Sequence, residues 1–203
     1  MKRFFIPAIL ILIFCGGGKE KNVSVQKTEL ELVQKKSVLI VIAHRDFRDE
    51  EFKEPFELLK NSGFKVTVAS TDTTPAKGML GMVVKPEILI SQVIPDSFNG
   101  LVIAGGTGFK ELWDDKVLHN IIRNFYDNHK TIAAICIAPV ALARAGILKD
   151  KKATVYPQVA DEIKPYCREF TSRDVEISDN VITGSGPQAA KEFARAILEA
   201  ISK

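Results

Sequence analysis

The stretch 131–139 (TIAAICIAP) most constrains the fold, because an apolar run of strand formers passes there directly into an alanine-rich helical segment. A single thiol, Cys136, lies at the junction. A buried strand that runs straight into a helix turns sharply, which places the residue at the turn beside the unpaired N–H groups of the new helix. These groups and the helix dipole favour negative charge, so the pattern predicts a lowered pKa and a partly ionised thiolate for Cys136. The alternative that the local sequence leaves open is a small, buried core cysteine.

Strand and helix patterns alternate along the rest of the chain. Apolar runs of strand formers predict strands at 37–43, 65–70, 101–104, 153–155, 175–177 and 181–183, besides the strand that leads to Cys136. Amphipathic or alanine-rich patterns predict helices or helical turns at 50–61, 88–94, 111–113, 116–128, 159–164 and 188–201, besides the helix that follows Cys136. Turn residues in 73–84 predict a short hairpin excursion. This order indicates an open, mostly parallel sheet with helices on both faces, in which sites lie beyond the carboxyl ends of the strands.

The first residues differ from the rest of the chain. A positively charged start precedes the apolar run 4–14, which is typical of a secretory signal and too short for an ordinary membrane span. Cys15 closes this run as in the lipidation site of bacterial lipoproteins, although Phe14 replaces the small residue normally found before that cysteine. The alternatives are an uncleaved signal anchor and a misassigned start codon. We therefore expect a lipoprotein-type signal, a polar tether and one folded domain, at 1–15, 16–36 and 37–203.

This organisation predicts a lipid-anchored protein of the cell envelope, or a cytoplasmic protein if the signal is not functional. The net charge of +3 is too small and too evenly spread to indicate a nucleic-acid partner. The cysteines and histidines lack the spacing of a zinc site or a disulfide framework: Cys15, Cys136, Cys167, His44, His119 and His129. We expect no metal, no cofactor and no membrane contact other than the N-terminal anchor.

A glycine pair could act together with Cys136. Gly105 and Gly106 follow the strand predicted at 101–104. If this strand lies beside the one that leads to Cys136, an N–H group near Gly106 and that of Ile137 face a common point next to the sulfur. Two such donors are what an oxyanion or a thiohemiacetal oxygen needs. The alternative is a glycine turn that merely lets the chain leave the strand.

An acid in the first turn of the next helix could reach the same sheet edge. Glu51 occupies that turn, where Glu50 and Glu54 compete with it. A carboxyl group held in a partly apolar pocket has a raised pKa and can donate a hydrogen bond or transfer a proton. The alternative for all three acids is a solvated carboxylate that the helix dipole favours.

Four motifs of the chain resemble the ThiJ/PfpI superfamily: 133–139 (AAICIAP), 102–106 (VIAGG), 49–51 (DEE) and 183–187 (TGSGP). They occur in the order and with the spacing of that superfamily, from about residue 37 to the C-terminus. The resemblance implies a flavodoxin-like three-layer sandwich, a nucleophile elbow at Cys136 and frequent homodimerisation. It also implies that Glu51 is a protonated carboxyl group next to the thiolate, and that Gly106 and Ile137 supply oxyanion N–H groups.

The chain departs from the superfamily where a histidine is expected. The deglycase-like branch has a histidine before a proline where this chain has Tyr156, and the protease-like branch has one directly after the cysteine where this chain has Ile137. His44, at the end of the first strand, could approach the site; the alternative is a solvent-facing loop histidine. Tyr156 could donate a hydrogen bond to a substrate oxygen. The resemblance implies a glyoxalase or deglycase that acts on small reactive carbonyls through Cys136 and Glu51. The alternatives are a stress-responsive protein with an oxidisable Cys136 and, third, a cysteine peptidase.

Overall fold

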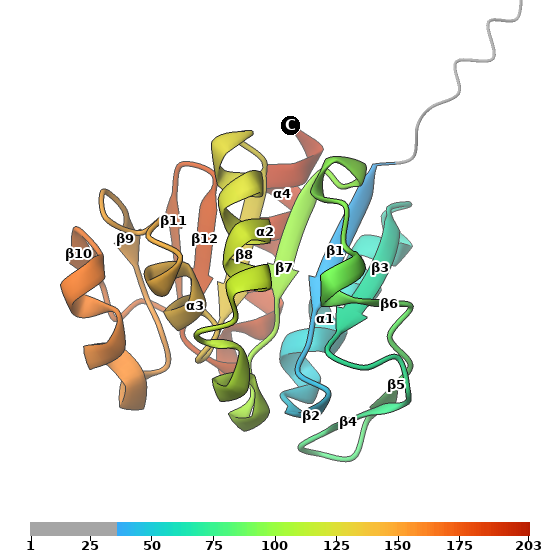
Figure 1. Ribbon diagram of the computed structural model, residues 1–203. Coiled ribbons are helices and arrows are strands. Elements are labelled where there is room, and N and C mark those ends of the chain that lie inside the picture. The colour runs from blue at the N-terminus through green and yellow to red at the C-terminus, as the bar shows by residue number, and fades with distance from the viewer. Residues whose placement is uncertain (1–35) are drawn as a thin grey trace, which may run out of the picture. The chain divides into compact units, whose positions relative to one another are not determined.

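The computed structural model describes residues 36–203, so the predictions for Cys15, for the signal and for the tether concern residues outside the described part of the chain. A seven-stranded sheet forms its centre (Figure 1). In spatial order the strands are β11 (Val175–Ser178), β12 (Val181–Gly184), β8 (Thr131–Ile135), β7 (Gly100–Ile103), β1 (Ser37–Val41), β3 (Lys65–Ser70) and β6 (Ile88–Leu89). All neighbouring strands run parallel except β11, which pairs antiparallel with β12.

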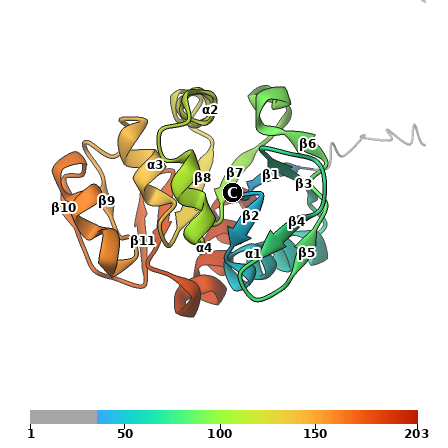
Figure 2. The same cartoon turned by 60° about the horizontal axis from the view of Figure 1, so that its bottom comes forward.

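Helices cover both faces of this sheet, which gives three layers (Figures 1 and 2). Helices α1 (Asp49–Asn61) and α4 (Ala190–Ser202) pack together on one face, and α2 (Lys116–Asp127) and α3 (Pro139–Arg144) pack together on the other. The central strands are therefore buried on both sides, which explains their continuous apolar sequences. The predicted flavodoxin-like α/β sandwich is confirmed.

One predicted helical segment is partly wrong. Residues 88–94 begin with strand β6, which pairs with Ala69 and Ser70 of β3, and only Ile90–Gln92 form a 3₁₀ turn, η1. An apolar run this short does not distinguish a helix from a strand, and the free edge of β3 decides the matter by pairing with it. The other 3₁₀ segments are η2 (Pro95–Ser97), η3 (Thr107–Leu112), η4 (Pro157–Glu162), η5 (Lys164–Tyr166) and η6 (Pro187–Ala189).

Two small sheets flank the main one. Strand β9 (Lys152–Ala153) pairs with β10 (Glu169–Phe170), and β2 (Arg45–Phe47) pairs with β4 (Ala76–Gly78), which pairs in turn with β5 (Val83–Val84). The antiparallel pair of β4 and β5 confirms the predicted hairpin. The buried carboxylate of Asp49 accepts hydrogen bonds from the N–H groups of Leu80 (2.9 Å) and Met82 (2.8 Å), so the start of α1 holds the hairpin turn. Within 36–203, none of the helices is long and apolar enough to cross a bilayer.

Candidate active site

Cys136 lies at the sharp turn between β8 and α3. Its φ angle is +63°, a left-handed conformation that is uncommon for a residue other than glycine and that costs about 1–3 kcal/mol. Two backbone hydrogen bonds hold the turn: the Cys136 N–H group donates to the Gly184 carbonyl at 2.9 Å, and the Tyr156 N–H group donates to the Cys136 carbonyl at 3.0 Å. The turn has the form of the predicted nucleophile elbow, and it projects the thiol beyond the carboxyl end of β8.

The glycine pair lies directly beside this elbow, because β7 and β8 are neighbours in the sheet. A Cβ atom on Gly105 would lie 2.7 Å from the Cβ atom of Cys136 and 2.8 Å from Oε2 of Glu51, so only glycine allows this close approach. Gly106 has a φ angle of +101°. Its backbone N–H group and that of Ile137 lie close enough to the Cys136 sulfur to lower the pKa of the thiol, so the structure brings Gly106, Ile137 and Cys136 together.

Glu51 reaches the same point from the first turn of α1. Its side chain is fully buried, and its Oε2 atom accepts a hydrogen bond from the Gly105 N–H group at 3.0 Å. Its Oε1 atom is buried without a hydrogen-bond partner among the described residues, and its carboxyl group lies close enough to Cys136 for each group to shift the pKa of the other. The structure therefore selects Glu51 from the three competing acids: Glu50 instead pairs with Arg48 at 2.8 Å.

The prediction of a lowered pKa for Cys136 is wrong. Burial, followed by the nearby charge of Glu51, raises the pKa of the Cys136 thiol to about 12, and the N–H groups of Gly106 and Ile137 oppose this shift only in part. The residue is 8% exposed, so loss of hydration outweighs the two donors.

Glu51 and Cys136 titrate as a pair. Burial raises the pKa of Glu51 to about 7, against the opposing effects of the neighbouring Cys136 thiol and of the hydrogen bond from the Gly105 N–H group. Above this pKa the pair holds one negative charge and one proton, and each group has a backbone donor that stabilises its anion. Movement of the proton from sulfur to carboxylate would produce a thiolate without adding a second charge to the buried site.

The sulfur faces a cavity of about 190 Å³. Its lining contains the predicted residues Glu51, Gly106, Cys136, Ile137 and Tyr156, and in addition Arg48, Met79, Thr107, Gln158 and Pro187. The added residues come from the start of α1, the hairpin turn, η3, η4 and η6, which are far apart in the sequence. Of these, Arg48 has a sequence signal, because it immediately precedes the acids of α1. Within 36–203 no group of three or more histidine, cysteine or acidic side chains could hold a metal ion.

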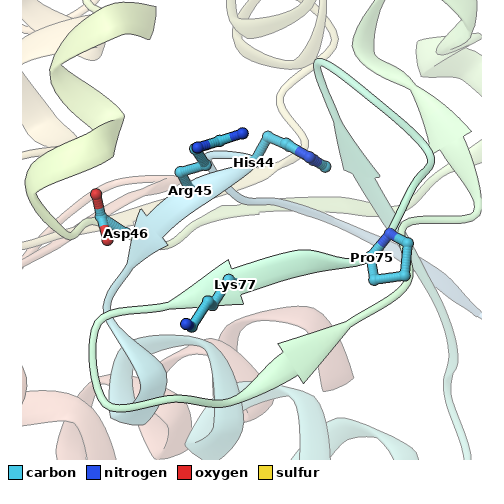
Figure 3. A pocket seen from close by; sticks show the side chains of 5 residues that line it. All are labelled: His44, Arg45, Asp46, Pro75 and Lys77. Atoms are coloured by element: carbon cyan, nitrogen blue, oxygen red, sulfur yellow. The ribbon is translucent and has the colours of Figure 1, made fainter.

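His44 does not join this site. It lines a separate cavity of about 370 Å³ together with Arg45, Asp46, Pro75 and Lys77 (Figure 3). Its ring nitrogen Nε2 lies 3.3 Å from the Thr74 hydroxyl group. The structure therefore does not place His44, a possible substrate contact, beside Cys136: His44 precedes β2, and the chain reaches the Cys136 cavity at Arg48, directly after β2.

A flavodoxin-like sandwich with a cysteine at a strand-to-helix elbow and a buried acid beside it defines a class of cysteine proteins. A profile of the DJ-1/PfpI family matches residues 36–200 of this chain. The chain belongs to the DJ-1/PfpI family. The predicted resemblance to the ThiJ/PfpI superfamily is thereby confirmed.

Individual relatives agree with this assignment. An uncharacterised protein of Methanocaldococcus jannaschii is 44% identical over 176 residues, which cover 85% of this chain and 86% of that protein. The glutathione-independent glyoxalase DJR-1.2 of Caenorhabditis elegans is 29% identical over 84% of this chain and 91% of its own. The crystal structure of a ThiJ/PfpI domain protein from Brachyspira murdochii has a TM-score of 0.80 and 31% identity, over 83% of this chain and 98% of that one.

Proposed function

We propose that this protein converts small 2-oxoaldehydes such as methylglyoxal into 2-hydroxy acids without a cofactor, in the manner of a glyoxalase. One observation carries the proposal: the buried Glu51 carboxyl group and the Cys136 thiol line the same small cavity, close enough to shift each other's pKa, and the backbone N–H groups of Gly106 and Ile137 lie beside the sulfur. The name of the worm relative, a glutathione-independent glyoxalase, supports the same reaction class. A deglycase reaction would begin with the same attack of sulfur on a carbonyl carbon.

The first step forms a thiohemiacetal. The Cys136 proton passes to the Glu51 carboxylate while the sulfur bonds to the aldehyde carbon, and the electron pair of the C=O bond moves to oxygen. The N–H groups of Gly106 and Ile137 stabilise this oxyanion, which then takes the proton from Glu51. No histidine is required, because the carboxylate serves as the base.

The second step moves a proton between carbons. Glu51 removes the proton of the carbon bonded to sulfur and returns a proton to the neighbouring carbon through an enediol, which leaves a thioester on Cys136. Water then hydrolyses the thioester, releases the 2-hydroxy acid and restores the thiol. The whole reaction adds one water molecule to the substrate and needs no external oxidant or reductant. Tyr156 lines the cavity where it can donate a hydrogen bond to a substrate oxygen.

The test is the rate of methylglyoxal consumption by the wild type, Cys136→Ser and the control Cys167→Ser. We expect the control to match the wild type and Cys136→Ser to lose activity. Because Glu51 must be ionised to act as the base, kcat/KM should rise with pH up to about 7, the pKa of Glu51, and then level off. Equal rates for the wild type and Cys136→Ser would overturn the proposal.

A further inference from the structure

Among the residues of 36–203 that line the Cys136 cavity, Arg48 is the single cationic side chain. It occupies the N-cap position of α1, and its backbone N–H group donates to the Gly105 carbonyl at 3.0 Å. Its backbone is thus tied to the same loop that positions Gly106. Arg48 lines the cavity, and its side chain is 27% exposed, so it is not enclosed by the protein.

Glu50 orients this guanidinium group. The Nε atom of Arg48 donates to Oε2 of Glu50 at 2.8 Å, and Nη2 donates to Oε1 at 3.0 Å. These two bonds occupy one edge of the planar group, and Nη1 has no hydrogen-bond partner within residues 36–203. A guanidinium group carries five N–H donors, so a second edge remains for a planar oxyanion such as a carboxylate.

The guanidinium group also lies within the field of the reacting pair. The hydrogen bond with Glu50 raises the pKa of Arg48 most, burial opposes it, and the charges of Glu51 and Cys136 raise it further. The other polar side chains of the lining, Thr107, Tyr156 and Gln158, are neutral. Within residues 36–203, Arg48 is thus the one positively charged group that a negatively charged ligand meets in this cavity. Its charge is shared with Glu50, but its unpaired N–H groups can still donate to the ligand.

The size of the cavity limits the ligand. Its volume of about 190 Å³ corresponds to about six water molecules, which suits a reacting group of a few carbon atoms. We propose that the substrate carries a carboxylate close to its reactive carbonyl, with the carboxylate on the free edge of Arg48 and the carbonyl carbon at the Cys136 sulfur. This assignment rests on the proposed function and narrows its substrate class to small carbonyl acids.

The test uses two alkylating agents of nearly equal size that differ in charge, iodoacetate and iodoacetamide. In both reactions an S–C bond forms at Cys136, iodide leaves, and the thiol proton is lost. Mass spectrometry gives the alkylation rate of each thiol with each agent. Cys167 does not line this cavity, so its ratio of iodoacetate to iodoacetamide rates serves as the control within the same molecule. Alkylation needs no turnover, so its outcome is independent of the methylglyoxal assay.

For each thiol we take the rate of alkylation by iodoacetate divided by the rate by iodoacetamide, and we divide the value for Cys136 by the value for Cys167. This normalised ratio should be about fivefold or more higher in the wild type than in Arg48→Met. Arg48→Lys, which keeps the charge and loses the planar fork, should lie between them. In the wild type alone, salt should lower the ratio at Cys136 more than at Cys167. The inference would be overturned if the wild type and Arg48→Met gave equal ratios. If Arg48→Met does not fold, it would be overturned by a ratio at Cys136 of the wild type that responds to salt no more than the ratio at Cys167. Loss of methylglyoxal turnover in Cys136→Ser would leave the proposed function standing in either case.

Discussion

Replacement of Glu51 by glutamine should make the protein more stable at neutral and higher pH, although it removes a group of the proposed reaction. The carboxyl group is fully buried, and burial raises its pKa from 4.5 to about 7. The folded state therefore holds the Glu51 proton more tightly than the unfolded state does. The stability that this proton supplies is fully present below pH 4.5 and is lost as the pH rises through about 7.

The size of the effect follows from the shift in pKa. Each pKa unit corresponds to about 1.4 kcal/mol, so the whole shift is worth about 3 kcal/mol, of which about 2.5 kcal/mol falls between pH 5 and pH 8. Glutamine has nearly the same shape and does not titrate. The free energy of unfolding of Glu51→Gln should therefore rise by about 2.5 kcal/mol relative to the wild type over this interval. The thiol of Cys136, with a pKa of about 12, stays protonated throughout and does not contribute.

Urea unfolding at a series of pH values between 5 and 8 measures this difference. The matched control is Glu57→Gln, which removes the same charge from the same helix at a position where the side chain is 56% exposed. Its effect on stability should vary little with pH, because an exposed carboxylate loses little hydration on folding. The assignment of a buried, protonatable acid at this position would be refuted if the free energy of unfolding of Glu51→Gln relative to the wild type varied with pH as little as that of the control. A relative stability that falls as the pH rises would refute it as well.

Two further substitutions test the packing of the site. Gly105→Ala should lower the melting temperature by about 5 °C, because its Cβ atom would overlap the reacting pair, and it should slow alkylation of the catalytic thiol. Gly63→Ala, where nothing lies within 4 Å of the added carbon, should leave that rate unchanged. An unchanged melting temperature and rate for Gly105→Ala would show that the site is looser than the structure indicates. Trp113→Phe removes the indole N–H group that donates to the Ile137 carbonyl at 2.9 Å. It should lower kcat more than it raises KM, because Ile137 supplies an oxyanion donor in the proposed reaction; an unchanged kcat would argue against this role.

Much of the fold is readable from local sequence. The apolar runs that become β1 and β8 are long enough to identify buried strands, and helices α1, α2 and α4 show the spacing of amphipathic helices. The elbow is also predictable, because a strand pattern passes into a helix pattern at one cysteine. Residues 88–94 were ambiguous, since the free edge of a distant strand decided between strand and helix.

The amino-acid sequence by itself determined the alternation of strands and helices, the position of Cys136 at a turn and the shortlist of acids near the start of α1. These features depend on residues a few positions apart, whose spacing is visible in the chain. The tertiary structure decided which acid meets the sulfur, that the thiol pKa rises, that His44 lies in another cavity and that Arg48 faces the site. Burial and charge at one atom depend on segments brought together from across the chain. The Gly105 N–H group and the Glu51 carboxylate, which hydrogen-bond although 54 positions apart, show why no local pattern contains this information.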